Sequence, residues 1–406
     1  MEQFHQVVIV GGGTAGITVA AQLKRQAKGI DVAIVDPADK HYYQPLWTLV
    51  GAGIFDKSKS ERSEASLIPK GVTWYQQRTE SFQPEENTIQ LQDGSTMHYK
   101  YLVVCPGIQL DWDNIEGLEE NLGKNGVCSN YSYEHVQYTW ECIRDFRGGN
   151  AVFSYPQSAV KCGGAPQKIM YLAEEAFRKQ GVRDLTNVSF YSANPGIFSV
   201  EKYTKVLNQI IEDRDIHAHF QKNLIHIDGE NRKATFQDIN TKEKETISYD
   251  MLHAVPYMSS PDFVANSSLA DDNGWVDVNA YTLRHSTYAN VFSLGDVCSA
   301  PTSKTGAAIR KQAPTVVSNM LALMNNKQPW KQYDGYTSCP LVTGYSSLIM
   351  AEFKYGNVPS ETFPIDQSKE RYSMFLMKKY GLPAMYWHGM MTVSYTHLTL
   401  PTICSV

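Results

Sequence analysis

Several features that would indicate common protein classes are missing from this sequence of 406 residues. No window approaches the ~20 consecutive apolar residues that a membrane-spanning helix needs, so any membrane contact is predicted to be peripheral. The 37 basic and 42 acidic residues give a net charge of −5, without a basic stripe of the kind that neutralises phosphates. Nucleic acid is therefore not an expected partner.

Cysteine usage excludes two further classes. The seven cysteines are scattered without the CxxC pairs of a structural zinc site, and no cluster of histidines and carboxylates suggests another metal. The first predicted strand, residues 7–10, begins so close to Met1 that no presequence is expected. A secreted framework held by disulfides is therefore disfavoured.

The N-terminal region instead carries a dinucleotide-binding pattern. Residues 7–10 form a continuous β-branched run, typical of a buried parallel strand, and lead into a glycine-rich turn and an apolar helix. Gly11, Gly13 and Gly16 complete a G-x-G-x-x-G motif, in which glycines permit a sharp turn and the close approach of a pyrophosphate. Asp36 ends the next predicted strand, at the spacing expected for a carboxylate that binds an adenosine ribose.

Two later segments indicate which dinucleotide binds. Residues 101–107 resemble the strand and glycine, here Gly107, that return the chain past the cofactor in flavoproteins with two dinucleotide-binding domains. Residues 287–296 resemble the second FAD fingerprint of the same superfamily, with Gly295 for close backbone approach and Asp296 to accept a hydrogen bond from a ribityl hydroxyl. Three such elements in this order predict FAD.

The middle of the chain lacks the loop that a nicotinamide cofactor would need. Residues 151–155 again predict a strand, but residues 156–168 lack a second G-x-G-x-x-G motif. Reduction by NAD(P)H is therefore disfavoured, and Cys162 stands where that cofactor would dock.

These patterns predict an α/β fold built of two Rossmann-like, dinucleotide-binding subdomains. The FAD-binding subdomain is expected to comprise residues 1–147 and 259–332, and the second subdomain is expected to comprise residues 148–258. The final residues, 392–406, resemble the translation of a sequencing adaptor and are predicted to be a non-native tail.

Residues 333–391 form a C-terminal segment rich in apolar, aromatic and Met residues. One interpretation is an ordinary core helix followed by a hydrophobic tail. The other is a pair of interfacial helices that associates with a membrane, with Tyr386 and Trp387 at the depth of the lipid headgroups.

Two cysteines are placed for chemistry. Cys162 and Cys339 each lie in a predicted turn beside proline and glycine, which presents a side chain, whereas Cys105 lies in a predicted strand. Lys161, next to Cys162, and the helix predicted to start after Pro166 would both lower the pKa of the Cys162 thiol. Sequence spacing alone leaves open whether the two thiols meet, and a purely structural role is the alternative.

From Val7 to about Met391 the chain resembles the type II group of sulfide:quinone oxidoreductases, which occurs in mitochondria and bacteria. The resemblance is carried by five long motifs, at residues 42–53, 160–172, 301–305, 333–345 and 363–371. It implies an FAD enzyme with Cys162 and Cys339 as its redox pair. It also implies peripheral binding to a membrane surface, expected at the cytoplasmic face of a bacterial inner membrane.

The resemblance implies a reaction sequence as well. The two cysteines can be bridged at rest, in relatives through extra sulfur. Sulfide attacks the bridge, which leaves a persulfide on the Cys339 side and, on Cys162, a thiolate that donates its electron pair to the flavin. The persulfide sulfur passes to a small acceptor, such as sulfite, a thiol or sulfide itself, and two electrons pass to a membrane quinone.

Cofactor contacts are implied at Thr14, Ala15, Asp36, Gln44, Thr79, Asp296 and Lys304. Lys304 precedes a helix predicted at residues 305–308, whose N-terminal dipole would add to the ammonium in stabilising negative charge on a reduced flavin. Lys168 and Lys378 match family lysines near the flavin or the quinone, with ordinary surface positions as the alternative. Cys128 is no part of the type II pattern and is interpreted as a residue without a role in the reaction.

Two other functions remain open. An NADH:quinone oxidoreductase has the same architecture but needs the second glycine-rich loop that residues 156–168 lack. A redox-inactive, flavin-bound sulfide sensor would not need an intact pair of Cys162 and Cys339. His41 is interpreted as a structural histidine, since it has no neighbouring partner in the sequence.

Overall fold

The apolar N-terminal run forms the centre of the first sheet. The computed structural model, which describes residues 3–392, has β1 (Gln3–Val10) between β2 (Val32–Val35) and β8 (Thr96–Val104), all parallel. Residues 7–10 are almost fully buried, as expected for a parallel strand covered on both faces. The order is β5-β2-β1-β8-β7-β6, with β19 paired to β8. The remaining strands of this sheet are β5 (Thr73–Tyr75), β6 (Thr79–Gln83), β7 (Thr88–Leu91) and β19 (Val291–Ser293).

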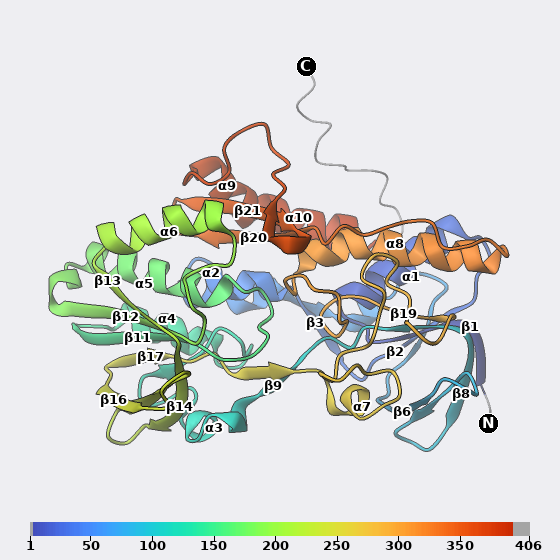
Figure 1. The fold of residues 1–406 in the computed structure, drawn as a ribbon, viewed down its shortest axis with the longest axis horizontal. Helices are drawn as coiled ribbons and strands as arrows, with labels where there is room; N and C mark the ends of the chain where they lie inside the picture. Colours follow the sequence, from blue (N-terminus) through green and yellow to red (C-terminus); the bar gives the residue numbers. More distant parts are fainter. Residues whose placement is uncertain (1–2, 393–406) are drawn as a thin grey trace.

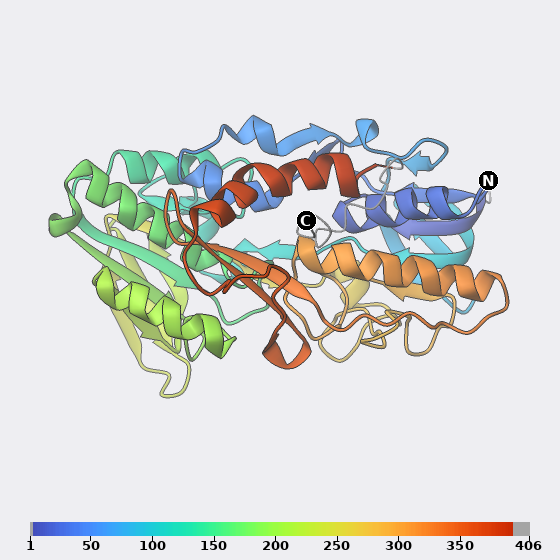
Figure 2. The same cartoon turned by 90° about the horizontal axis from the view of Figure 1, so that it is seen from above.

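Two long helices pack side by side on this sheet (Figure 2). Helix α1 (Thr14–Gln26) starts directly after the glycine loop, and α8 (Gly306–Met324) lies beside it. The Thr305 hydroxyl accepts a hydrogen bond from the Ala308 N–H and caps α8. The helix predicted at residues 305–308 is therefore confirmed as the start of this longer helix. Of the predicted non-native tail, all but Thr392 lies outside the described residues.

The second sheet repeats the arrangement around β11 (Gly149–Tyr155). Its five parallel strands run in the order β10-β17-β11-β12-β13. Figure 1 shows β17, β11, β12 and β13 side by side in this order. The other strands are β10 (Val127–Cys128), β12 (Thr186–Ser192), β13 (Ile216–Phe220) and β17 (Met251–His253), and the helices of this subdomain are α4 (Val136–Arg144), α5 (Ala165–Gln180) and α6 (Glu201–Asp213). The α/β fold with two Rossmann-like sheets is thereby confirmed.

One strand lies across the expected boundary between the subdomains. Residues 1–147 were assigned to the FAD-binding subdomain, but β10 pairs with β17 of the second sheet, with Val127 opposite Leu252. Helix α4 likewise packs against β10 and α5. Because β10 is two residues long and pairs with a strand far along the chain, the local sequence carries no signal for its position.

Smaller elements complete the two subdomains. The antiparallel pairings are β14-β15-β16, β9-β18 and β3-β4. These strands are β3 (Lys40–Tyr42), β4 (Glu61–Ser63), β9 (Gln109–Asp111), β14 (Lys222–Asp228), β15 (Lys233–Asp238), β16 (Lys244–Ser248) and β18 (Tyr257–Ser259). The short helices are α2 (Trp47–Gly51), α3 (Leu118–Asn121) and α7 (Asp262–Ala265), with single 3-10 turns at η1 (Gln44–Leu46), η2 (Lys57–Ser60), η3 (Glu64–Ser66), η4 (Trp112–Asn114), η5 (Arg183–Leu185) and η6 (Tyr355–Asn357).

The C-terminal segment joins the two subdomains. Its antiparallel sheet consists of β20 (Thr337–Val342), β21 (Leu348–Lys354) and β22 (Val358–Pro359), and β20 contacts both α5 and α8. The chain then forms one continuous helical run of α9 (Tyr372–Leu376), η7 (Met377–Gly381), α10 (Leu382–Met385) and η8 (Tyr386–Met390) (Figure 2). The predicted pair of interfacial helices is therefore a single run. Within residues 3–392, no helix is long and apolar enough to cross a membrane.

Two aromatic residues of this run are buried, so the prediction that they lie at headgroup depth is wrong. Tyr386 and Trp387 are 4% and 7% exposed, because both rings pack against His41. The exposed aromatic side chains of the run are Tyr372 and Tyr380, at 60% and 57%. The exposed aromatic residues of the run are therefore Tyr372 and Tyr380, and not Tyr386 and Trp387.

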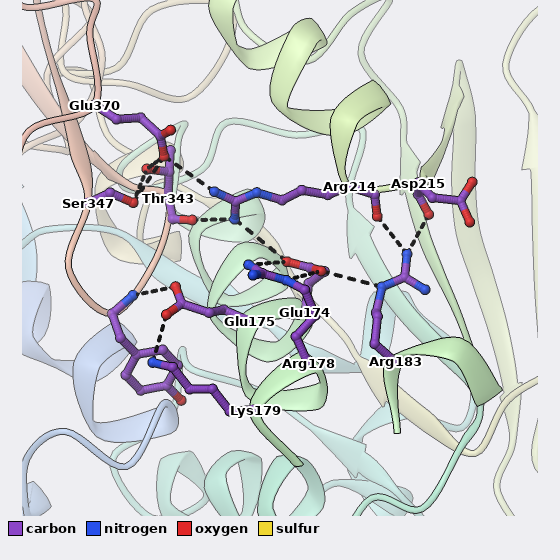
Figure 3. A network of polar contacts seen from close by, with 11 residues as sticks. Glu174, Glu175, Arg178, Lys179, Arg183, Arg214, Asp215, Thr343, Ser347 and Glu370 are labelled. Carbon is purple, nitrogen blue, oxygen red and sulfur yellow. Dashed lines mark hydrogen bonds and ion pairs between the residues drawn. The ribbon is translucent and has the colours of Figure 1, made fainter. Parts of the chain in front are cut away.

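A charged network fixes the C-terminal sheet to the second subdomain (Figure 3). Glu174 is buried on α5 and accepts two hydrogen bonds from Arg178. Its oxygens also lie 3.4 Å from Arg183 Nε and 3.7 Å from Arg214 Nη1. Arg214 in turn donates to the carbonyl oxygen of Thr343, just after β20, at 2.5 Å. The network therefore holds β20 beside α5, which sets the distance between the side chains that these two elements carry.

Candidate active site

One large cavity lies where the two subdomains and the C-terminal segment meet. Its volume is about 1310 Å³. It extends from the glycine loop after β1, past the turn before α5, to the C-terminal helical run. A concave space of this size at a junction of subdomains is the first candidate for a binding site.

The glycine loop shapes one end of this cavity. Gly11 has a φ of +107°, and a Cβ at Gly16 would lie 1.9 Å from the Gly11 carbonyl oxygen, so both positions need glycine for the loop to close on α1. Gly13 differs, because a Cβ there would meet no atom of the described residues within 4 Å. The N-terminus of α1 opens onto this space, and its unpaired N–H groups suit a phosphate.

Two carboxylates line the cavity beyond the loop. Asp36 Oδ2 accepts a hydrogen bond from the Gly12 N–H at 2.6 Å, which places Asp36 beside the loop as a ribose-binding role requires. Burial raises the pKa of Asp296, and its Oδ1 has no partner within residues 3–392. A buried carboxylate oxygen without a protein partner is expected to meet a ligand hydroxyl. The loop and the two carboxylates therefore fit a dinucleotide such as FAD.

The residues predicted to bind this cofactor fall into two groups. The larger group lines the cavity and comprises Gly13, Thr14, Ala15, Asp36, Gln44, Gly107, Gly295, Asp296 and Lys304. Gly11 and Gly16 are packed behind the wall, where they let the loop close. Thr79, on β6, is buried but is not among the residues that line the cavity.

The two predicted redox cysteines meet at the edge of the cavity. Their Sγ atoms lie 3.4 Å apart, within reach of an S–H···S hydrogen bond and beyond the ~2.05 Å of a disulfide. Cys162 occupies the turn before α5, as predicted, with a φ of +60°. This left-handed conformation is uncommon outside glycine and often marks a functional site.

Cys339 does not lie in the predicted turn. It is a buried residue of β20, opposite Ala351 of β21. The neighbouring Pro340 is tolerated there because β20 is an edge strand, which needs no second partner for its N–H groups. The strand therefore presents the Cys339 thiol from a fixed backbone.

Glycine at position 164 allows the two cysteines to approach. A Cβ there would lie 2.6 Å from Cys339 Sγ and 2.3 Å from Leu341 Cδ2. The Cys162 N–H donates to the Lys304 carbonyl oxygen at 2.7 Å, which fixes the other end of the turn. The sulfur–sulfur contact is therefore set by the backbone on both sides.

The two thiols differ electrostatically. The pKa of Cys162 lies well below its ordinary value because the Cys339 thiol donates a hydrogen bond to it, and because the Lys168 ammonium lies 3.1 Å away; burial acts in the opposite direction. The same hydrogen bond, together with burial, raises the pKa of Cys339. Cys162 is therefore the thiolate of the pair and Cys339 the thiol.

The lysine beside the thiolate is not the one that the sequence indicated. Lys168 is buried on α5; burial alone would lower its pKa, but the attraction of the two sulfurs outweighs this and the pKa is raised. Lys161 was expected to lower the pKa of Cys162. It interacts instead with Asp296, and burial lowers its pKa to about 8. The first turn of α5 brings Lys168 back to Cys162, a contact that adjacency in the sequence does not reveal.

Two further lysines line the cavity. Lys378 is buried, and its Nζ donates to the Pro45 carbonyl oxygen at 2.8 Å; burial and the nearby Lys168 charge lower its pKa to about 7. Lys304 Nζ donates to the Asp296 carbonyl oxygen and lies 3.7 Å from the centre of the Trp275 ring. Burial lowers the pKa of Lys304. An ordinary surface position is therefore excluded for Lys378, as it is for Lys168.

A buried hydrogen-bonded chain that the sequence did not indicate lies beside the glycine loop. His41 Nδ1 lies 3.1 Å from Glu64 Oε2, and His41 Nε2 lies 2.5 Å from the Tyr386 hydroxyl. The Tyr386 hydroxyl also lies 2.7 Å from Thr14 Oγ1, which ties the C-terminal helical run to the start of α1. Because these four residues come from separate segments, no local pattern could have indicated the chain.

The remaining cysteines that the structure describes lie apart from the dithiol. The Cys105 thiol faces the Gly11 carbonyl oxygen at 3.7 Å, and the Cys298 thiol donates to the Gly295 carbonyl oxygen at 3.3 Å. Burial raises the pKa of Cys105, Cys128 and Cys298, which keeps these thiols protonated. Among residues 3–392, no group of three or more His, Cys, Asp or Glu side chains is placed to hold a metal ion.

Known proteins resemble this chain over most of its length. The family model described as pyridine nucleotide-disulphide oxidoreductase matches residues 5–320. The chain is 48% identical over 394 residues to the mitochondrial sulfide:quinone oxidoreductase of Dictyostelium discoideum, across 96% of this chain and 87% of that protein. The chain belongs to the sulfide:quinone oxidoreductase family. A Mus musculus protein of the same name is 47% identical over 388 residues, across 95% of this chain and 86% of that protein.

A solved structure shares the fold. The sulfide:quinone oxidoreductase of the hyperthermophilic bacterium Aquifex aeolicus superposes with a TM-score of 0.81 at 21% identity, across 97% of this chain and 93% of that chain. Membership of the family makes this chain an enzyme, a flavoprotein oxidoreductase with FAD as its cofactor. The glycine loop and the carboxylates that line the cavity fit that cofactor.

Proposed function

We propose that this chain oxidises sulfide with Cys162 and Cys339, passes the electron pair by way of FAD to a quinone, and transfers the sulfur to a small acceptor. The observation that carries the proposal is the pair of sulfur atoms 3.4 Å apart, with the Lys168 ammonium 3.1 Å from Cys162, whose pKa lies well below its ordinary value. A dithiol with one member of low pKa is suited to thiol–disulfide exchange. The names of the relatives supply sulfide and quinone as the expected substrates.

The first step starts from the bridged form of the pair. Hydrosulfide attacks Cys339 Sγ and forms a new S–S bond; the bond between Cys162 and Cys339 breaks, and its electron pair leaves on Cys162 as a thiolate. Lys168 stabilises that thiolate from 3.1 Å. The observed spacing also suits a bridge with one extra sulfur, since two bent bonds of about 2.05 Å span about 3.3 Å.

The second step returns the pair to its bridged form. A small nucleophile, such as sulfite, a thiolate or a second hydrosulfide, attacks the outer sulfur of the Cys339 persulfide, and Cys339 leaves as a thiolate. The two thiolates then rejoin with the loss of two electrons. FAD, when bound, supplies the chemistry of a two-electron acceptor that a quinone can reoxidise.

The C-terminal helical run supports the quinone and the membrane as partners. Met377, Leu382 and Met385 line the cavity and provide an apolar wall for a quinone. Tyr372 and Tyr380 of the same run are exposed, as suits an interfacial position. We therefore propose peripheral binding to the membrane that contains the quinone. The bacterial inner membrane predicted from the sequence gains no support from the two eukaryotic relatives, whose names place them in mitochondria.

The NADH:quinone alternative is less well supported. The turn between β11 and α5 has no G-x-G-x-x-G motif, and Cys339 Sγ fills the space that a side chain at Gly164 would take. The sensor alternative does not explain why Cys162 and Cys339 form a dithiol, because a redox-inactive sensor needs no pair of thiols. Both alternatives predict a flavin that sulfide does not reduce.

An anaerobic absorbance titration tests the proposal. Sulfide should bleach the flavin of the purified protein, and a short-chain quinone should restore it. Cys162→Ser and Cys339→Ser should each slow bleaching by at least about 1000-fold, because each removes a reacting atom. Cys128→Ser, at a buried thiol outside the dithiol, is the matched control and should stay within about twofold of the wild type.

Other outcomes identify the alternatives. Reduction by NADH without reduction by sulfide would replace the proposal with the NADH:quinone function. A spectral change without bleaching would indicate a sensor.

A further inference from the structure

Two adjacent polar side chains in the cavity wall have no hydrogen-bond partner among the described residues. Asn130 and Tyr131 are 8% and 5% exposed, yet neither amide atom of Asn130 nor the Tyr131 hydroxyl is paired. Both residues line the cavity. Because buried polar groups in folded proteins are nearly always paired, unpaired groups on residues that line a cavity indicate a ligand.

The backbone holds these two side chains in place. The Asn130 N–H donates to His253 Nε2 at 3.0 Å, and the Tyr131 N–H donates to Ser129 Oγ at 3.3 Å. Burial lowers the pKa of His253 to about 3, so the ring stays a neutral acceptor at physiological pH. The Asn130 amide also packs directly on Gly51, where a Cβ would lie 2.2 Å from Oδ1. The unpaired atoms therefore keep their position at the cavity wall.

Tyr131 lies beside the dithiol. It packs in one apolar cluster with Val160 and Ala165, which flank Cys162 in the sequence. Burial raises the pKa of its phenol, and negative charge on Cys162 raises it further. Tyr131 and Cys162 both line the cavity, and among the described residues the Tyr131 hydroxyl makes no hydrogen bond to either sulfur.

Other buried hydroxyls without a partner are placed differently. The Tyr99 and Tyr249 hydroxyls also lack a partner among the described residues, but neither residue lines the cavity. Tyr249 packs in a separate apolar cluster, away from the dithiol. Tyr249→Phe therefore serves as a matched control, because it removes a buried phenol oxygen outside the cavity.

We infer that Asn130 and Tyr131 form the site from which sulfide, as the hydrosulfide ion, approaches the bridge between Cys162 and Cys339. The Asn130 amide N–H and the Tyr131 O–H are donors, and hydrosulfide is an acceptor with one heavy atom. The Lys168 ammonium beside Cys162 adds favourable charge for an anion. The inference rests on the proposed function and names the binding site of its substrate.

Stopped-flow reduction of the flavin by sulfide, under anaerobic conditions, tests the inference. Tyr131→Phe removes one hydroxyl and keeps the ring, so the second-order rate constant for reduction should fall about tenfold, the effect of one hydrogen bond to an anion. Asn130→Ala should give a similar fall. The bound FAD content and the rate of reoxidation by a short-chain quinone should stay at their wild-type values.

A binding measurement separates this role from a general loss of activity. In the unreactive Cys162→Ser background, sulfide is titrated against the flavin absorbance to obtain a dissociation constant. Adding Tyr131→Phe should raise that constant about tenfold. Tyr249→Phe removes an equally buried hydroxyl outside the cavity and should change neither the constant nor the rate.

The outcomes are distinct. A wild-type rate and a wild-type dissociation constant for Tyr131→Phe would overturn the inference while the proposed function stands. Loss of FAD, or an equal slowing of the quinone step, would also overturn it, since the hydroxyl would then serve the cofactor. If sulfide fails to bleach the wild-type flavin, the proposed function itself is wrong and this inference falls with it.

Discussion

The two Rossmann-like subdomains use the same sequence of strand, turn and helix in different ways. In the first, the turn between β1 and α1 leaves open space at Gly13. In the second, the turn between β11 and α5 carries Cys162, and the space next to Gly164 is filled by Cys339 Sγ. The positive end of α1 faces the place for a cofactor phosphate, and α5 begins beside a thiolate.

The comparison shows that the start of a helix provides a general site for negative charge, while the turn before it decides which group occupies the site. The first site is local, because the loop, α1 and β2 follow one another in the chain. The second site needs β20, which the network around Glu174 holds against α5. Changes in the two turns are therefore expected to have different consequences.

Among three changes that compare the two turns without removing a reacting sulfur, the largest effect is expected at Gly13. Gly13→Ala should leave the fold intact, because a Cβ there meets no atom of the described residues within 4 Å, but it would intrude on a bound pyrophosphate. The affinity for FAD should fall by more than about 100-fold. Flavin content after gel filtration measures the loss of FAD binding. The thermal unfolding of the apoprotein shows whether the fold is intact.

The control is Gly196→Ala, at a position outside the cavity where a Cβ also meets no atom of the described part of the chain within 4 Å. It should retain FAD. If Gly13→Ala binds FAD as tightly as the wild type, the glycine loop is not the phosphate site and the comparison between the turns fails.

A smaller effect, and of a different kind, is expected at Gly164. Gly164→Ala would place a Cβ 2.6 Å from Cys339 Sγ and push the two sulfurs apart, so reduction of the flavin by sulfide should slow by about 50-fold. FAD content should not change, because this turn holds no phosphate. Stopped-flow reduction and flavin content together provide the measurement.

The neighbouring Gly163→Ala is the control for this prediction. Among residues 3–392, its Cβ would meet only the Tyr155 hydroxyl, at an ordinary contact distance of 3.4 Å, and the rate should stay within about twofold of the wild type. Loss of FAD from Gly164→Ala would contradict the assignment of the cofactor phosphate to the first turn and of the dithiol to the second.

The smallest effect is expected at Lys168, and it depends on pH. The Cys339 thiol and Lys168 together keep the pKa of Cys162 below its ordinary value. Lys168→Met should raise that pKa, so the thiolate fraction falls first at low pH. The rate of reduction by sulfide should fall about tenfold near pH 6 and less at alkaline pH, where Cys162 ionises without help.

Lys179→Met, on the exposed side of the same helix, should leave the pH profile unchanged. The profile is measured as the rate of flavin reduction between pH 6 and pH 9. An equal loss at every pH would show that Lys168 acts by packing and not by its charge.

The sequence predicted the parts of the site that are encoded locally. The loop of Gly11, Gly13 and Gly16 and the carboxylate of Asp36 follow a spacing that the geometry of a strand, turn and helix dictates, and the structure brings them together. The turn position of Cys162 was also predicted. Cys339 was expected in a turn and lies in a strand, because the pattern of proline and glycine around it also suits an edge strand.

The pairing of distant side chains could not be predicted in the same way. Lys161 was expected beside the Cys162 thiol because it is adjacent in the sequence, yet the first turn of α5 places Lys168 there. One of the two interpretations of the C-terminal segment placed Tyr386 and Trp387 at a membrane interface, but both are buried. Aromatic composition does not show which face of a helix is covered. Whether a side chain is buried depends on the segments that pack against it, and these segments lie elsewhere in the sequence.

By itself, the sequence determined that this chain folds into a dinucleotide-binding α/β protein, because glycine spacing and apolar periodicity act over a few residues at a time. Only the tertiary structure decided that the two thiols meet, that Lys168 is the lysine beside Cys162, and which tyrosines line the cavity. The first and the last depend on contacts between segments far apart in the chain, such as β20 against α5, where burial and charge act through space.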